Sequence, residues 1–173
     1  MLFVSDRLIE TERAPAPVIR GASHERGFRA GTEAIHQIAG LGAAARWVLA
    51  DIDEGALKLR TRRDRLHELL ANDVPQLALH GPKRERLPNT LNVGFPGLTG
   101  ADLLEAADVV EASVGSACHA GETRPSPVLE AMRVPLESAR GAVRLSLGRL
   151  TTDEEIERAA AALVNAWRSL GGK

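Results

Sequence analysis

The one cysteine of this chain, Cys118, lies in the stretch richest in glycine and serine, residues 113–121, and His119 follows it directly. A free cysteine is usually buried and inert, and it becomes a nucleophile where its thiolate is accessible and stabilised. This segment has neither helix nor strand periodicity, and loops of small residues carry function more often than packing. The local sequence therefore favours a reactive thiol over a buried one.

Arg144 is the second candidate for chemistry, because it stands between apolar residues in a predicted, mostly buried strand, residues 142–147. An unpaired buried charge is costly, so its guanidinium needs a partner. The sequence alone leaves two kinds of partner open for the Arg144 guanidinium. One is an internal carboxylate, the commoner case, and the other is a substrate carboxylate held by the two-pronged guanidinium fork.

Weaker signals come from His119 and Thr32. Adjacent residues seldom turn their side chains toward each other, so His119 is interpreted as a solvated loop residue rather than the base for Cys118. The other histidines show no metal-ligand spacing, and we expect no metal site. Thr32 precedes a long predicted helix, where it is the expected N-cap; the helix start is either plain capping or an anion site.

Composition bounds the class of protein. The chain has 173 residues, 44% of them hydrophobic and 26% charged, with a formal net charge of −1. These values are typical of a globular protein and argue against a nucleic-acid or membrane-surface partner. One cysteine, and no apolar run long enough for a signal peptide or a membrane span, lead us to expect a cytoplasmic protein. Only three residues are lysines, Lys58, Lys83 and Lys173.

Hydrophobic periodicity predicts helices first and then strands mixed with helices. A long helix is expected from about residue 33 to 50, and a second, partly solvated helix over 52–72. The remaining predicted elements are strands at 2–4, 77–80, 90–95, 109–113 and 142–147, and helices at 99–107, from 125–127 to about 132, and from a Thr152/Glu155 capping box onward. The pattern indicates an α/β fold, a small sandwich with helices against one side of a few strands.

Four motifs in order resemble the C-terminal part of a known family. They are Arg26–Glu33, Leu87–Val93, Ser113–Cys118 and Val143–Arg149. Together they resemble the cysteine desulfurases, which are pyridoxal-phosphate (PLP) enzymes of the class-V aminotransferase type. The segment 112–119, with 125–129 after it, resembles the selenocysteine lyase branch more closely still.

The resemblance implies a fold and its division. We expect the C-terminal part of a PLP-dependent transferase type I fold, with a small α/β sandwich domain and long N-terminal helices from the large-domain junction. Residues 1–50 would be the remnant of the large cofactor domain with its linking helix, and residues 51–173 the small domain.

The resemblance also implies a role for each motif residue. Cys118 would take sulfur from L-cysteine, or selenium from L-selenocysteine, to leave alanine and a persulfide-type intermediate. Arg144 would hold the substrate carboxylate. Thr32 would contact the PLP phosphate from the neighbouring subunit of a homodimer. A sulfur-acceptor protein is a further possible partner.

The family's Schiff-base lysine falls, by the same resemblance, just upstream of Met1. None of the three lysines here has the desolvated neighbourhood that such a lysine needs. The expectation is a chain that needs a missing N-terminal half, whose absence would expose the apolar residues Ile35, Ile38 and Leu41 and favour self-association. Two alternatives stay open: a non-enzymatic persulfide carrier and a degenerate interaction domain.

Overall fold

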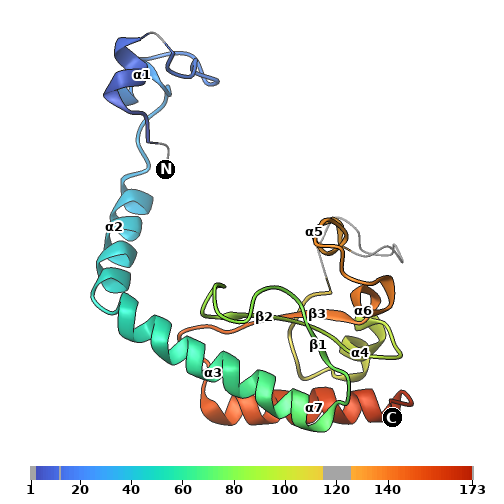
Figure 1. Cartoon of the computed structure of the whole chain (residues 1–173). Helices are drawn as coiled ribbons and strands as arrows, with labels where there is room; N and C mark the ends of the chain where they lie inside the picture. Colours follow the sequence, from blue (N-terminus) through green and yellow to red (C-terminus); the bar gives the residue numbers. More distant parts are fainter. Residues whose placement is uncertain (1–2, 12, 115–125, 173) are drawn as a thin grey trace. The chain divides into compact units, whose positions relative to one another are not determined.

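A computed structural model describes residues 3–11, 13–114 and 126–172 of the chain. It divides into two compact units, Met1–Ala50 and Asp51–Lys173. Figure 1 shows the elements of each unit. The interpretation of the first unit as part of a cofactor domain stays a prediction.

The first unit contains helix α1 (Asp6–Glu10), a 3-10 turn η1 (Glu25–Gly27) and helix α2 (Ile35–Leu49). The strand predicted at 2–4 is wrong where the structure describes it, because Phe3 and Val4 are not in a strand.

Thr32 is not the N-cap of α2, contrary to the sequence prediction. Ala34 occupies that position and offers no side-chain cap. The reason lies in the turn before the helix, where Gly31 has a φ of 103°. The guanidinium of Arg29 holds this turn by donating to the carbonyl oxygens of Gly31 at 2.8 Å and Thr32 at 3.3 Å.

The second unit begins with helix α3 (Ile52–Asp73), which confirms the predicted 52–72 helix. Three strands follow along the chain: β1 (Ala78–Leu79), β2 (Thr90–Gly94) and β3 (Ala142–Ser146). They form one antiparallel sheet in the order β1-β2-β3.

The strand predicted at 109–113 is wrong, because only Ser113 pairs with the sheet, through a single bridge to Arg144. The residues before it turn instead of extending: the amide of Val110 donates to the carbonyl of Ala107 at 2.9 Å. Val109 is exposed there, so its apolar side chain is not held against the sheet as the strand prediction required.

Four more helices lie in the described part of the second unit. They are α4 (Gly100–Ala106), α5 (Pro127–Ala131), α6 (Leu136–Arg140) and α7 (Asp153–Ser169). The predicted capping box starts α7: the Glu155 amide donates to Thr152 Oγ1 at 3.2 Å and the Thr152 amide donates to Glu155 Oε2 at 2.8 Å. The sequence did not predict α6.

The core of the second unit lies between one face of the sheet and the helices α3, α4 and α7. Figure 1 shows α3 and α7 side by side beneath the sheet, and residue contacts join them. The buried apolar residues include Leu66, Leu70, Leu91, Val93, Leu103, Val143, Leu145, Ile156, Leu163, Val164 and Trp167. The Trp167 indole also donates from Nε1 to the carbonyl of Pro96 at 3.0 Å. The mixed α/β fold expected from the sequence is confirmed.

Among the described residues, no helix is both long and apolar enough to cross a membrane.

Candidate functional site

Four residues form a row across the sheet, perpendicular to its strands. The amide of His80 donates to the carbonyl of Asn92 at 3.0 Å, and Asn92 is the register partner of Arg144. Arg144 in turn pairs with Ser113 through the isolated bridge. Directly opposed residues of antiparallel strands place their side chains on the same face. We call His80, Asn92, Arg144 and Ser113 the cross-sheet row.

This row lies on the face of the sheet that is opposite the core. In β3, Val143 and Leu145 are buried, whereas Arg144 between them is exposed. In β2, Asn92 is only partly buried between the buried Leu91 and Val93. The alternation of strand side chains therefore puts the polar residues on one face and the apolar core on the other.

The exposed position of Arg144 corrects the expectation of a mostly buried strand residue. Within the described part of the chain, no hydrogen bond or ion pair is formed by its guanidinium. A carboxylate partner for it is therefore not found among these residues. The side chain is accessible to a ligand from solvent.

His80 is the buried end of the row, with its ring held between two side chains. Its Nδ1 lies 2.7 Å from Asn92 Oδ1, and its Nε2 lies 2.8 Å from Ser138 Oγ. Ser138 comes from α6, which reaches this face because Gly94 of β2 has no side chain. A Cβ at Gly94 would lie 2.5 Å from the Ser138 carbonyl oxygen.

Sequence reasoning missed His80, Asn92 and Ser138 as members of a site. One signal was present: Asn92 is a polar residue alternating with Leu91 and Val93 in a predicted strand. Its pairing with His80 and Arg144 depends on strand register, which the local pattern does not supply.

Cys118 and His119 lie outside the described residues, in the segment 115–125. The described residues on either side of that segment are both connected to β3. Before it, Ser113 and Arg144 exchange backbone hydrogen bonds of 2.7 and 3.3 Å. After it, Ser126 Oγ caps α5 by accepting from the amide of Val128 at 3.3 Å.

Helix α5 is connected to the start of β3 by a small apolar cluster. Leu129 of α5, Ala139 of α6 and Ala142 of β3 are buried together, with Val134 packed against them. The chain thus leaves the sheet beside Arg144 and returns to a helix that packs near the same strand. The described residues that flank segment 115–125 thus lie near β3: Ser113 bridges to Arg144, and α5 shares the apolar cluster with Ala142.

Thr32 belongs to the first unit, where it is exposed. Its carbonyl oxygen is occupied by Arg29, whereas no hydrogen bond of its hydroxyl to another described residue is formed.

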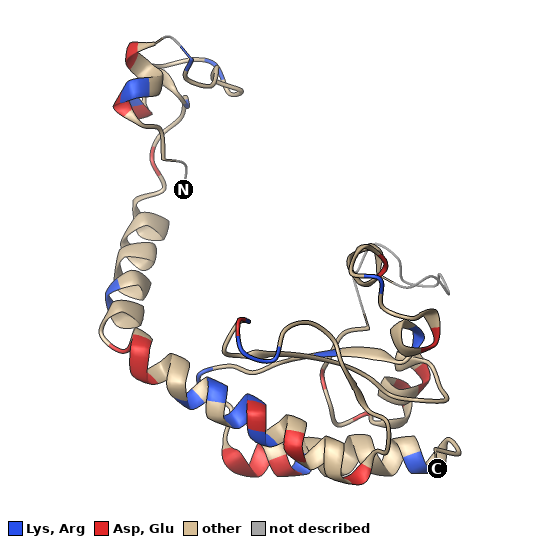
Figure 2. Cartoon of the chain, viewed as in Figure 1, with Lys and Arg blue, Asp and Glu red and all other residues tan. Residues whose placement is uncertain are grey.

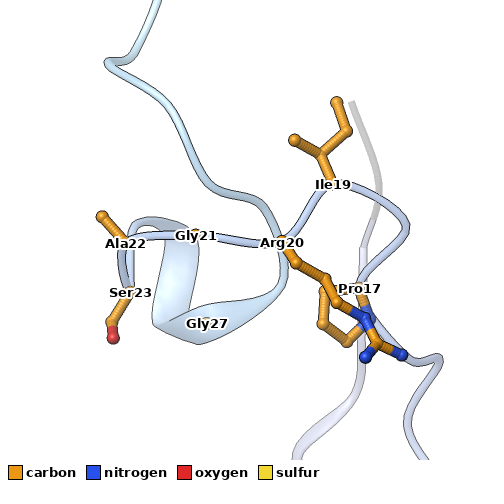
Figure 3. Close-up of a pocket in the computed structure, with 7 residues that line it drawn as sticks. All are labelled: Pro17, Ile19, Arg20, Gly21, Ala22, Ser23 and Gly27. Carbon is orange, nitrogen blue, oxygen red and sulfur yellow. The ribbon is translucent and has the colours of Figure 1, made fainter.

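A shallow pocket lies in the same unit, just before Thr32 in the sequence (Figure 3). Its volume is about 150 Å³, below the roughly 300–1,000 Å³ of typical ligand pockets. It is lined by Pro17, Ile19, Arg20, Gly21, Ala22, Ser23 and Gly27. Neither Thr32 nor Arg144 is among them, and the pocket is too small to be a cofactor site.

The described lysines do not meet the requirements of a Schiff-base lysine. Lys58 is exposed and its ammonium forms an ion pair with Glu54 at 2.5 Å. That hydrogen bond and the negative charge of Glu54 raise the pKa of Lys58, whereas an amine that attacks a carbonyl needs a lowered pKa. Lys83 is exposed in a loop. The described residues therefore do not by themselves make a PLP site.

Comparison with known proteins gives a family and relatives. Residues 17–159 match the model of the family described as aminotransferase class-V. A cysteine desulfurase of Gluconacetobacter diazotrophicus is 43% identical over 144 residues, and the cysteine desulfurase NifS of Azotobacter vinelandii is 42% identical over 144 residues. Each alignment covers 82% of this chain and 36% of the relative.

Comparison with solved structures agrees with the sequence comparison. The solved structure of a NifS-like protein superposes with a TM-score of 0.76 at 28% identity, covering 88% of this chain and 39% of that one. The chain thus spans little more than a third of the length of the curated relatives that it matches.

Proposed function

This chain belongs to the class-V aminotransferase family, and we propose that it supplies the sulfur-accepting half of a cysteine desulfurase active site. The substrate would be L-cysteine, because the similar relatives are named as cysteine desulfurases. L-selenocysteine is the second candidate substrate, from the resemblance of residues 112–129 to the lyase branch. The carrier and interaction-domain alternatives have no comparable support.

One observation carries the proposal: Arg144 is exposed on the sheet beside Ser113, from which the chain runs toward Cys118. A guanidinium without a partner among the described residues is suited to a carboxylate ligand, which it binds through two parallel hydrogen bonds. In this assignment Arg144 fixes the amino acid by its carboxylate, and the thiol of Cys118 approaches the sulfur at the other end of the same molecule.

The step assigned to Cys118 is a transfer of one sulfur atom. The thiolate of Cys118 forms a bond to the substrate sulfur, and the bond between that sulfur and the substrate carbon breaks. The electron pair of the broken bond stays on carbon, which takes up a proton and becomes the methyl group of alanine. The thiol is oxidised to a persulfide and the carbon is reduced, so no external oxidant is needed.

The family implies PLP as the cofactor. When bound, PLP would supply the electron sink that makes the substrate carbon able to release its sulfur. In this chain we assign Thr32 to the phosphate, across a homodimer interface, because its exposed hydroxyl is open to a ligand. The Schiff-base lysine is assigned to a segment outside the described residues, because neither described lysine, Lys58 nor Lys83, is suitable.

The proposal is tested by mass spectrometry and alanine assay with the purified chain, PLP and L-cysteine. One arm contains the chain alone, and the other adds the part of the Gluconacetobacter cysteine desulfurase that lies outside its alignment with this chain. We expect alanine and one added sulfur on Cys118 only in the second arm, and neither product with Cys118→Ser.

Three other results of this assay would contradict the proposal. Alanine formed by the chain alone, together with a borohydride-fixed adduct on Lys58 or Lys83, would show that the chain holds its own cofactor site. Sulfur taken up from a persulfide donor, without alanine in either arm, would favour the carrier. Alanine formed equally well by Cys118→Ser would overturn the role of the thiol.

A further inference from the structure

Asn92 has its carboxamide oxygen and nitrogen in different environments. The oxygen, Oδ1, faces His80 Nδ1 at 2.7 Å. The amide nitrogen, Nδ2, forms no hydrogen bond with another described residue. Because an amide nitrogen carries two hydrogens and only donates, Nδ2 is a pair of available donors on the open face of the sheet.

The neighbour of Asn92 on the side away from His80 is Arg144, its register partner on β3. Opposed residues of antiparallel strands have Cβ atoms roughly 4.5–5.5 Å apart, within reach of one small ligand. The guanidinium also only donates. Two donor-only groups on one exposed face cannot satisfy each other, whereas an anion with two oxygen atoms can accept from both.

His80 determines which way the Asn92 amide faces. Since a carboxamide oxygen only accepts, the hydrogen must lie on His80 Nδ1. On the other side of the ring, Nε2 lies 2.8 Å from the hydroxyl oxygen of Ser138, which holds the imidazole in place. His80 is buried, so its ring is enclosed by these protein partners. The imidazole thus fixes Oδ1 toward itself and leaves Nδ2 for the ligand.

We propose that Asn92 is a second carboxylate-binding residue beside Arg144, and that His80 is the positioning residue that orients the Asn92 amide. This inference rests on the proposed function, which assigns the substrate carboxylate to Arg144. It adds a specificity element: a planar carboxylate, with one oxygen for the guanidinium and one for the amide, satisfies both groups, whereas a neutral amide offers only one acceptor oxygen.

The test is a titration of the full chain with L-alanine, the amino-acid product, followed through the side-chain amide resonance of Asn92 in ¹⁵N-¹H spectra. L-Alaninamide, which lacks the carboxylate, is the ligand control. We expect the Asn92 Nδ2 resonance to shift with L-alanine and to stay in place with L-alaninamide. For variants that lack this resonance, the backbone amide of Arg144 reports binding.

The variants separate the two roles. Asn92→Asp keeps an acceptor for His80 Nδ1 but replaces the donor by a carboxylate, so affinity should fall by roughly tenfold or more. His80→Asn places an amide nitrogen where Nδ1 was and should bind L-alanine as the unsubstituted chain does. His80→Gln places its nitrogen near the Nε2 position instead, loses the donor to Asn92, and should weaken binding and alter the Asn92 resonance.

Thr90→Val is the matched control, since Thr90 lies on the same face of β2 but opposite Ser146 rather than Arg144. It should leave binding unchanged. The spectrum of each variant also shows whether the sheet is folded, so a loss of binding is counted only in a folded protein. His80→Asn tests the orientation even if His80→Gln does not fold.

The outcomes distinguish this inference from the function on which it rests. If Arg144→Ala abolishes binding while Asn92→Asp and His80→Gln bind normally, the roles of Asn92 and His80 are overturned and that of Arg144 stands. If Arg144→Ala binds normally, or the unsubstituted chain gives no carboxylate-dependent shift, the assignment of the substrate carboxylate to Arg144 is overturned, and this inference with it.

Discussion

Arg144 and Ser113 exchange two backbone hydrogen bonds, of 2.7 and 3.3 Å, although no strand is formed around Ser113. The two bonds fix the departure point of the chain toward Cys118 relative to the guanidinium. They use only the main chain of Arg144, so its side chain can be replaced without breaking them. A substitution of the Arg144 side chain should therefore change activity without changing the stability of the fold.

Arg144→Lys should lower activity and leave stability unchanged. Lysine keeps the positive charge but lacks the planar fork, so in the two-component alanine assay the rate at low L-cysteine should fall by roughly tenfold or more. Because Arg144 is exposed, the free energy of unfolding in urea should change by less than about 0.5 kcal/mol. A parallel loss of stability and activity would contradict the separation.

Thr152→Ala should destabilise the second unit by removing half of the capping box of α7. The expected cost is about 1 kcal/mol, since the Glu155 amide loses its acceptor at the helix start. Urea unfolding monitored by circular dichroism measures it. Arg158→Ala, an exposed position on the same helix, is the control and should stay within about 0.5 kcal/mol. Equal effects of the two substitutions would argue against the cap.

His67 should make stability depend on pH. Burial first, and then the positive charge of Arg86, lower the pKa of His67 below its ordinary value of 6.5. The unfolded chain therefore binds a proton at this residue more readily than the folded chain does. The contribution is complete above pH 6.5 and is lost as the pH falls from 6.5 through the lower folded pKa.

Urea unfolding at pH 7.5 and at pH values below 6.5 tests this dependence. The loss of stability on acidification should be smaller in His67→Gln than in the unsubstituted chain. His36→Gln, at an exposed histidine of α2, serves as the control. An unchanged pH dependence in His67→Gln would show that this imidazole is not the group responsible.

Helix α2 should drive self-association of the chain. It has no buried residue and its one charged residue is Arg46, so Figure 2 shows it almost without charge. Ile35, Ile38 and Leu41 are 72%, 54% and 53% exposed, which makes an apolar surface of the kind that mediates protein association. Size-exclusion chromatography over a range of concentrations should show oligomers.

A double substitution, Ile38→Lys with Leu41→Lys, should shift that equilibrium toward the monomer by adding charge to this surface. Gln37→Lys adds one charge at an exposed polar position of the same helix and should have a smaller effect. A monomer at every concentration of the unsubstituted chain would refute the prediction.

The long helices of the second unit could be predicted from sequence because each carries its own signal. Helix α7 has a capping box and a buried stripe that includes Ile156, Leu163 and Trp167, all at helix spacing. Helix α6 has only five residues, too few for periodicity or propensity to decide. It is stabilised by tertiary contacts, of Ala139 with the apolar cluster and of Ser138 with His80.

The candidate site was accessible from sequence only in part. Cys118 and Arg144 could be proposed from their types and neighbours, and their roles stay predictions. The expectation that Arg144 is mostly buried failed because flanking apolar residues do not bury a strand residue between them; they lie on the opposite face. The relation of Arg144 to His80 depends on the pairing of three strands, which no single segment encodes.

The packing of Trp167 has a consequence for spectroscopy. The chain has two tryptophans and no tyrosine, so its intrinsic ultraviolet emission comes from the two indoles. Trp167 is 2% exposed in the second unit, whereas Trp47 is 58% exposed in the first. A water-soluble quencher such as iodide reaches one and not the other. The unquenched emission is then an optical probe for the unit that carries Arg144, and needs no label.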